Sequence, residues 1–519
     1  MGSKLLRGSF FMLIGNLIFR VGGYLYRFLM ASLLGPAKYG ILGITLPFQG
    51  ILQTFSTGGL PPAIAKYVAE YEILDQKDMA RQTIYTSLKM ITILGLFFGA
   101  LMVFVIAPWL GEVFLEKPET VLPLQIVGLI VPFSSIVGGI RGAFQGVYKM
   151  EYMLYSRAVE QVGMILFATA FVLLGLSVVG AMFGTVLGFI FSLIVSVYIF
   201  RNHMGKYIPK PNPDFKFSLN DELKLIKKLL FFSFPVVITS IAEMGIYSVC
   251  TIVMGRYLST ELVGYFAAAD PIARLPLIIS LSISTTILPA ASEAFSSKNR
   301  EKLTTYVTQS YKYSLVVVVP MCVAIALFST QILEIVYFTN PDYVYGAAAL
   351  AILSVGMTFY SIYVITSSII QGIGNPKIPM YILIGGLIIT LILNIILVPT
   401  HGIVGGSIAT TIACLAMIIP GLYLVFRLTK TKAPVKEISK ILIASIIMGA
   451  IILIILPKST VGLVIGIIIC PIIYLFSLIK LNFFTFDDIN KIRPIAAKLG
   501  PLSNILNKII NYIAKNIKE

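Results

Sequence analysis

One feature constrains the fold of this chain more than any other: apolar stretches of about 20 residues follow one another along most of its length, separated by short polar connections. A helix of about 20 apolar residues crosses the hydrocarbon core of a bilayer. Hydrophobic residues make up 57% of the 519 residues and charged residues only 12%, about half the charged share of a soluble domain. We therefore expect an all-α polytopic membrane protein.

The apolar stretches predict about fourteen transmembrane helices. One stretch, residues 162–200, carries no charge and would form a single helix of about 58 Å at 1.5 Å per residue. Because that length is nearly twice the thickness of the hydrocarbon core, we predict a tight turn near Gly175 to Gly180 that divides this stretch into two crossings.

The basic residues predict the orientation of these helices. Alternating the loops across the membrane places 22 Lys and Arg residues on one side. The other side receives four, namely Lys38, Lys117, Arg256 and Lys458. Basic residues accumulate on the cytoplasmic side of helical membrane proteins, so we expect a multi-pass protein of the cell membrane with both termini cytoplasmic. This distribution also accounts for the net charge of +17 without a nucleic-acid partner, because the basic residues do not form one patch.

Matching residues at a nearly constant offset predict an internal repeat. Gly40 and Pro47 recur as Gly264 and Pro271, and the Gln-Gly pair at 145–146 recurs at 371–372. The repeating unit holds six of the predicted helices. An even number of helices keeps both copies in the same orientation, so we predict two parallel six-helix bundles related by an axis along the membrane normal.

The repeat predicts how the chain is organised. We expect an N-terminal bundle at 1–200, a cytoplasmic linker at 201–228, a C-terminal bundle at 229–428, two additional transmembrane helices at 429–481 and a cytoplasmic tail at 482–519. In the linker, Ser218 and Asp221 have the spacing of a capping box that begins a helix. The tail repeats apolar residues at helical spacing, which predicts an amphipathic helix on the membrane surface. These residues are Leu502, Ile505, Leu506, Ile509, Ile510, Ile513 and Ile517.

Ionisable residues inside the predicted spans are the candidates for a functional site. Arg20 and Arg27 lie in the first span, Glu243 in the seventh, and Asp270 and Arg274 in the eighth. Each charge costs about 2.5 to 3.5 kcal/mol at a helix centre, so these residues must face water, one another or a ligand. Asp270 and Arg274 are four residues apart, which allows an ion pair on one helix face. Arg20 and Glu243 occupy nearly equivalent places in the two halves, and we expect them to meet across a cavity.

The residue types favour two kinds of ligand. A guanidinium binds phosphate oxygens in pairs and stays charged without water, which favours the three arginines as a substrate-binding set. The carboxylates of Glu243 and Asp270 are candidates to bind H⁺ or Na⁺ and couple transport to an ion gradient. Arg157 and Glu160 lie nearer the cytoplasmic end of the fifth span and are as consistent with a structural salt bridge as with a function.

The sequence indicates neither an enzyme nor a cofactor. It contains no G-x-x-x-x-G-K-[ST] and no H-E-x-x-H motif, and its two histidines, His203 and His401, fall in loops on opposite faces. The four cysteines are widely spaced single residues in apolar runs, which is typical of buried thiols rather than of metal ligands or disulfides. We therefore expect no catalytic residue, no cofactor and no metal.

Four stretches of the chain resemble a known family. They are Gly35–Gly40 (GPAKYG), Gln371–Met380 (QGIGNPKIPM), Leu391–Pro399 (LILNIILVP) and Gly402–Thr411 (GIVGGSIATT). The chain is similar in these stretches to the polysaccharide transporter, or oligosaccharide flippase, branch of the multidrug/oligosaccharidyl-lipid/polysaccharide exporter superfamily. Within that branch it most resembles the stage V sporulation protein B-like proteins.

The resemblance implies two six-helix bundles, often with two added helices, and movement of lipid-linked sugars from the cytoplasmic to the outer leaflet by alternating access. In related lipid II flippases, arginines of the first and eighth helices line a cationic cavity suited to a pyrophosphate. Arg20 and Arg274 correspond to them by position, and Arg27 is a further candidate. The expected substrate is an isoprenoid-linked oligosaccharide. Two alternatives remain, an ion-coupled exporter of small amphipathic cations and a non-transporting membrane scaffold.

Overall fold

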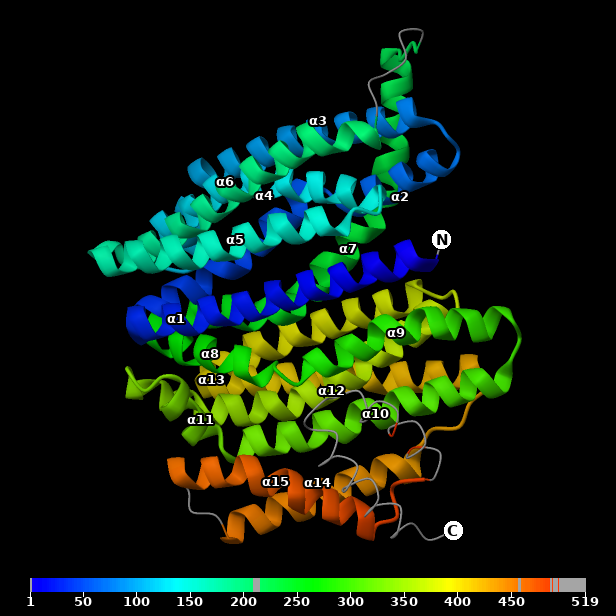
Figure 1. Cartoon of the computed structure of the whole chain (residues 1–519). Helices are drawn as coiled ribbons and strands as arrows, with labels where there is room; N and C mark the ends of the chain where they lie inside the picture. The colour runs from blue at the N-terminus through cyan, green and yellow to red at the C-terminus, as the bar shows by residue number, and fades with distance from the viewer. Residues whose placement is uncertain (1, 209–214, 456–458, 486–487, 489–492, 494–519) are drawn as a thin grey trace. The chain divides into compact units, whose positions relative to one another are not determined.

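A computed structural model describes residues 2–208, 215–455, 459–485, 488 and 493. In this part of the chain every long regular element is a helix and no strand occurs (Figure 1). The helices are α1 (Gly2–Thr57), α2 (Leu60–Ile73), α3 (Lys77–Leu101), α4 (Val121–Gly146), α5 (Met150–Phe171), α6 (Ser177–His203), α7 (Leu219–Tyr257), α8 (Thr260–Ala273), α9 (Leu277–Ser296), α10 (Arg300–Leu327), α11 (Ser329–Val336), α12 (Ala347–Gly372), α13 (Lys377–Thr429), α14 (Val435–Ile455) and α15 (Thr460–Lys480).

The predicted number of membrane crossings is confirmed for the described residues. Eleven helical runs are long and apolar enough to cross a membrane. Three of these runs break at a glycine with positive φ, namely Gly35 (73°), Gly175 (90°) and Gly402 (59°). Dividing the three runs there gives fourteen crossings. Gly175 lies where the sequence predicted a turn, and glycine adopts this left-handed backbone without the steric cost that a Cβ would add.

The predicted capping box at the start of α7 is also confirmed. The backbone N–H of Asp221 donates to Ser218 Oγ at 3.2 Å, and the backbone N–H of Ser218 donates to the Asp221 carboxylate at 3.2 Å. The helix that follows is 39 residues long and packs against α1, α2 and α3. The apolar stripe predicted for the tail, residues 502–517, lies outside the described residues.

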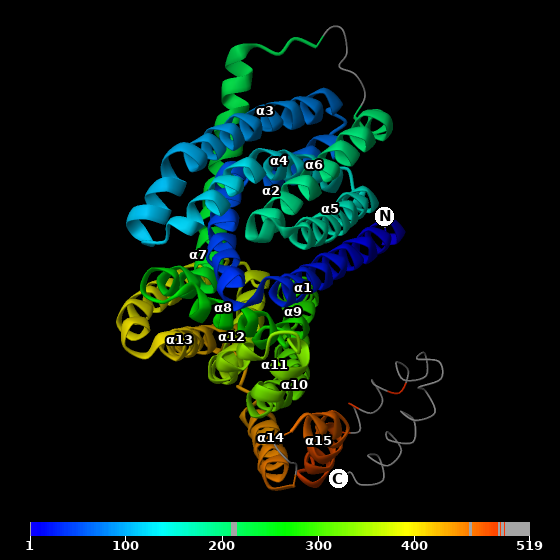
Figure 2. The same cartoon turned by 90° about the vertical axis from the view of Figure 1, so that its left-hand side faces the viewer.

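The chain forms two compact units. Unit 1 comprises residues 1–271, 337–343 and 387–406, and unit 2 comprises residues 272–336, 344–386 and 407–519. In unit 1, α5 and α6 run alongside each other and α4 packs on α2, α3 and α6 (Figures 1 and 2). In unit 2, α9, α10 and α12 pack on one another, and α14 packs between α10 and α15. The two units are defined by which residues pack together, whereas the bundles at 1–200 and 229–428 were predicted from the sequence repeat. The predicted bundles therefore stay a prediction.

Two glycines of unit 1 let α1 and α8 cross with their backbones in contact. A Cβ placed on Gly40 would lie 1.7 Å from the carbonyl oxygen of Thr260, and a Cβ placed on Gly264 would lie 2.0 Å from that of Pro36. The contact is reciprocal. Pro36 corresponds to Thr260 and Gly40 to Gly264 in the sequence repeat, and each glycine meets the carbonyl of the residue four positions before the other. Equivalent residues that exchange the same contact lie about a two-fold axis. The repeat seen in the sequence is therefore present in the packing of these two helices.

A buried polar network joins α4, α5 and α6 in unit 1. The guanidinium of Arg141 on α4 donates to the Glu160 carboxylate on α5 at 2.6 Å. It also donates to the hydroxyls of Ser156 and Ser192, each at 3.0 Å. Glu160 is only 3% exposed. Removal of one partner of such a pair leaves an uncompensated charge in a medium that solvates it poorly.

A second buried ion pair fastens the chain after α15 to α10 in unit 2. Lys312 on α10 pairs with Asp488, and their side chains are 9% and 6% exposed. The same carboxylate accepts hydrogen bonds from the hydroxyl of Tyr313 at 3.2 Å and from that of Thr485 at 2.7 Å. With the backbone N–H of Thr485, which donates at 2.9 Å, four donors satisfy the buried Asp488 charge.

The short connection between α3 and α4 is tied to the end of α7. Arg256 donates to the Glu116 carboxylate at 2.6 Å, and this hydrogen bond lowers the pKa of the exposed Glu116. Lys117 donates to the carbonyl of Gly255 at 2.7 Å, and its partial burial lowers the pKa of its ammonium. These contacts fix the relative height of α3, α4 and α7 within unit 1.

We expect Gly40→Ala to destabilise the protein, because the added methyl group meets a backbone carbonyl that cannot rotate away. Overpacking of this kind costs about 1 to 3 kcal/mol. Gly23→Ala in the same helix is the matched control, since a Cβ there meets no heavy atom within 4 Å. The control should be neutral or stabilising by up to about 1 kcal/mol. Thermal unfolding in detergent compares the two variants, and equal midpoints would contradict the close crossing.

Glu160→Ala should lower the free energy of unfolding by about 3 to 5 kcal/mol, because it leaves the buried Arg141 charge without its carboxylate partner. Replacing both members, Arg141→Met with Glu160→Leu, should recover most of that loss. Glu151→Ala serves as the control, since Glu151 pairs with Lys149 at 3.4 Å in the first turn of α5 and should contribute about 0 to 1 kcal/mol. Unfolding midpoints of the four proteins test the network. A double variant no more stable than Glu160→Ala would show that the pair is not the source of the effect.

Candidate functional site

Four of the five charged residues that the sequence predicts at membrane depth lie in unit 1. Arg20 and Arg27 are on α1, Glu243 is on α7 and Asp270 is on α8. Within this unit α1 packs against α7 and crosses α8 at the paired glycines. The fifth residue, Arg274, lies in unit 2.

Arg27 and Asp270 form an open ion pair. The distance from Arg27 Nη1 to Asp270 Oδ2 is 3.9 Å, and the side chains are 40% and 13% exposed. This separation is longer than the roughly 2.7 to 2.9 Å of a hydrogen-bonded pair between a guanidinium and a carboxylate. The structure shows no hydrogen bond from Arg27 to another described residue. The guanidinium therefore keeps donors that an additional anion can use.

The local pair expected between Asp270 and Arg274 stays a prediction. The helix α8 ends at Ala273, and Arg274 begins a turn in which its carbonyl accepts from the N–H of Leu277 at 3.1 Å. Pro276 in this turn has no N–H and cannot continue the helical hydrogen bonds.

The meeting of Arg20 and Glu243 that the sequence predicts stays a prediction. Both residues lie on long helices of unit 1, Arg20 on α1 and Glu243 on α7. Glu243 is exposed and Arg20 is partly exposed, although both lie well inside membrane-spanning helices. Exposed charges at this depth are stable only beside water, a partner or a ligand.

A short segment that the sequence analysis did not identify lies against both α1 and α8. It runs from Tyr337 to Tyr343 between α11 and α12 and belongs to unit 1. The Tyr337 hydroxyl donates to the carbonyl of Ala268 on α8 at 3.0 Å, and the Tyr343 hydroxyl donates to that of Ala31 on α1 at 2.8 Å. One segment thus bridges the two helices that carry Arg27 and Asp270.

The rings of this segment form an aromatic cluster with α1. The Tyr337 and Tyr343 ring centroids are 4.6 Å apart, and Tyr39 on α1 meets Tyr343 edge-on at 6.2 Å. All three tyrosines are at most 2% exposed, so this aromatic cluster is a buried contact between the segment and α1. The sequence signal was weak, because the segment and α1 lie far apart along the chain.

Arg157 and Glu160 do not belong to this group. Glu160 pairs with Arg141 rather than standing as a candidate for the site, and sequence analysis missed Arg141 because it counted that residue among the loop charges. The Arg157 guanidinium lies 5.4 Å from the ring centroid of Phe19 on α1. Both contacts join helices of unit 1.

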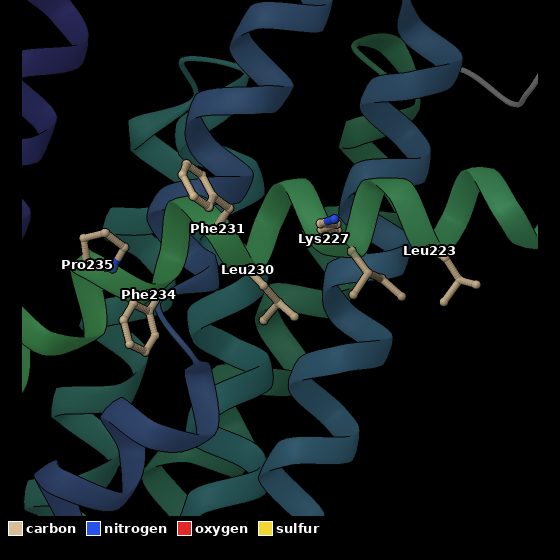
Figure 3. A pocket seen from close by; sticks show the side chains of 7 residues that line it. Leu223, Lys227, Leu230, Phe231, Phe234 and Pro235 are labelled. Carbon is tan, nitrogen blue, oxygen red and sulfur yellow. The ribbon is translucent and has the colours of Figure 1, made fainter.

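A separate apolar groove of about 550 Å³ lies along the first half of α7 (Figure 3). Leu223, Leu230 and Phe234 point to the same side of the helix, and Lys227 is the one charged residue of the lining. The groove ends at Pro235, which interrupts the hydrogen bonds of α7. Its composition is that of a surface facing acyl chains rather than a charged headgroup.

Comparison with known proteins identifies the family. A family model described as polysaccharide biosynthesis protein matches residues 5–295, and a second model, MatE, matches residues 235–396. An uncharacterized membrane protein, MJ1375 of Methanocaldococcus jannaschii, is 30% identical over 82% of this chain and 99% of its own length. The lipid II flippase MurJ of Bacillus subtilis is 23% identical over 86% of this chain and 88% of its own.

The fold agrees with a solved structure. A lipid II flippase MurJ in an inward closed conformation superposes with a TM-score of 0.72 at 20% identity, covering 90% of this chain and 98% of that one. At this identity the likeness concerns the fold alone. The family model covers more than half of the chain, and a relative 30% identical matches along nearly its whole length. The chain therefore belongs to the polysaccharide biosynthesis protein family of multi-span membrane proteins.

Proposed function

We propose that the protein is a flippase that moves an isoprenoid-linked oligosaccharide from the cytoplasmic to the outer leaflet by alternating access. The observation that carries this proposal is the open pair of Arg27 and Asp270, a guanidinium at membrane depth that is 40% exposed and held loosely at 3.9 Å. Relatives named as flippases, among them the lipid II flippase MurJ of Bacillus subtilis, support the substrate class.

The charges of α1, α7 and α8 would take the diphosphate of such a substrate. A guanidinium offers paired donors that match phosphate oxygens and stays ionised when water is excluded. Arg27 would exchange its long contact with Asp270 for shorter bonds to the headgroup, and Arg20 would extend the positive surface deeper along α1. Glu243 would neutralise Arg20 when no substrate is bound. Arg274, which the family resemblance also suggests, remains a candidate for the same set.

The aromatic cluster would close the site on the external side. The segment Tyr337–Tyr343, the α1 break at Gly35 and the start of α8 all fall on the side that the charge distribution predicts to be external. Hydrogen bonds from this segment to Ala31 and Ala268 hold α1 and α8 together there. Release of substrate to the outer leaflet would require these hydrogen bonds to break while the cytoplasmic side of the site closes.

The second candidate is an ion-coupled exporter of small amphipathic cations. The MatE match at residues 235–396 and the carboxylates of Glu243 and Asp270 favour it, since a carboxylate at membrane depth can bind a cation or a proton. In this function Asp270 would be the binding group and Arg27 its competitor. The two candidates thus assign opposite roles to the same pair, which makes them separable by substitution.

Arg27→Gln should slow flipping of a fluorescent polyisoprenyl-diphosphate sugar in proteoliposomes about 10- to 100-fold. This is the loss expected when hydrogen bonds to a charged group worth about 1.5 to 3 kcal/mol are removed. The measurement is the fraction of label that becomes accessible to an impermeant quencher with time. Arg27→Lys keeps the charge without the paired donors and should retain an intermediate rate.

Arg157→Gln is the control, because it removes an arginine of another membrane helix, α5, whose guanidinium lies 5.4 Å from the ring centroid of Phe19. The control should flip at the unmodified rate if it reaches the membrane in equal amount. Unchanged flipping by Arg27→Gln would remove Arg27 from the site. It would also take away the observation that carries the flippase proposal.

Asp270→Asn should separate the two candidate functions. The substitution removes the carboxylate that competes with the substrate for Arg27. A flippase should therefore bind a soluble short-chain isoprenyl diphosphate up to about tenfold more tightly, which corresponds to about 1.4 kcal/mol. An exporter should instead lose transport of a cationic dye driven by a proton gradient. Isothermal titration measures the first effect and dye efflux from proteoliposomes the second. Weaker diphosphate binding together with lost efflux would favour the exporter.

A further inference from the structure

A second hollow beside α7 differs in character from the apolar groove. It encloses about 360 Å³ between the end of α2, the start of α3, residues 215–217 and the first turns of α7. Lys216, Lys224 and Lys228 line it together with one carboxylate, that of Asp221. The lining therefore has a surplus of positive charge.

The carboxylate neutralises these lysines only in part, because it already serves the helix start. Asp221 accepts hydrogen bonds from the N–H of Ser218 at 3.2 Å and from its hydroxyl at 2.7 Å. Its distance to Lys224 is 3.8 Å, and the Lys224 side chain is 72% exposed. Lys216 forms no ion pair with another residue in the described part of the chain. Two ammonium groups at the mouth of the hollow are thus weakly compensated.

The third lysine is held in place by aromatic residues. Lys228 Nζ donates to the hydroxyl of Tyr71 at 3.0 Å and lies 4.3 Å and 4.9 Å from the ring centroids of Tyr67 and Tyr71. Its ion pair with Glu70 is long, at 3.7 Å, and both side chains are at least 40% exposed. An ion pair this long and exposed to solvent is weak. The ammonium is therefore positioned without being fully neutralised.

Apolar side chains also line the hollow, which lies where membrane helices begin. The rings of Phe215 and Phe217 stack with centroids 6.0 Å apart and planes at 17°. The helix α3 begins its span at Lys77 and α7 begins at Leu219, so the hollow is at the edge of the membrane-spanning part of unit 1. Lysines beside apolar side chains at this level match the phosphate and first methylene groups of an anionic lipid.

From this arrangement we infer that the hollow binds the phosphate group of an anionic membrane lipid. Lys216, Lys224 and Lys228 would contact the phosphate, and Phe215 and Phe217 would contact the start of the lipid chain. The lipid is either an anionic phospholipid or an isoprenyl phosphate, which share this chemistry. The inference goes beyond the proposed flippase activity and uses no residue of the Arg27 and Asp270 site, so either can fail without the other.

The test compares two double variants of the full-length protein that carry the same net charge. Lys216→Gln with Lys224→Gln removes two ammonium groups of the hollow and leaves Lys228 on its aromatic rings. Lys227→Gln with Lys432→Gln is the control, because Lys227 lies in the apolar groove of α7 and Lys432 is exposed in unit 2. All four lysines are on the side predicted to be cytoplasmic. Thermal unfolding should be equal in both variants, since the substituted side chains are exposed or make no close ion pair.

Lipid binding is measured by native mass spectrometry with phosphatidylglycerol, a polyisoprenyl phosphate and zwitterionic phosphatidylcholine as probes. Loss of the two lysines should weaken binding of the anionic probes roughly 30-fold, because each lysine near a membrane surface contributes about 1 kcal/mol. The control should bind as the unmodified protein does. Weakening confined to polyisoprenyl phosphate would identify the substrate class as the occupant, and weakening of both anionic probes would identify lipid phosphate in general. Equal affinities in the two double variants, or phosphatidylcholine bound as tightly as phosphatidylglycerol, would overturn the inference.

Discussion

The hydrocarbon core contains no water, so a charged side chain within it must have a partner, and this requirement organises the interior of the protein. Two of the ion pairs of unit 1 meet it differently. Arg141 and Glu160 are buried, bonded at 2.6 Å and supported by two serines. Arg27 and Asp270 are separated by 3.9 Å, and Arg27 remains 40% exposed. The first pair is hydrogen-bonded and joins α4 to α5, whereas the second is longer and more exposed to solvent.

The charges and the helices that carry them could be predicted from the sequence, whereas the partner residues of Arg27 and Glu160 could not. Hydropathy and the cost of charge at depth singled out Arg27, Asp270 and Glu160, because these properties depend on the residue and its neighbours in the chain. Partners on other helices follow from tertiary packing. Arg141 was missed for this reason, and so was the aromatic segment Tyr337–Tyr343, whose contacts with α1 join distant parts of the sequence.

Helix ends were more predictable than contacts. The break at Gly175 followed from an apolar run too long for one crossing, and the capping box at Ser218 followed from a local hydrogen-bond pattern. The end of α8 was not predicted. Arg274 follows it in a turn that contains Pro276, which has no N–H to continue the helical hydrogen bonds.

The reciprocal crossing of Gly40 and Gly264 bears on the origin of the chain. In a symmetric homodimer, a glycine near the two-fold axis touches its own counterpart, so a single glycine in one gene supplies both sides of the contact. After duplication and fusion of such a gene, the two positions would be inherited separately while the steric demand on each stayed the same. A larger residue on either helix still meets the carbonyl of the other. The crossing thus has the form expected of an ancestral dimer interface retained inside a single polypeptide.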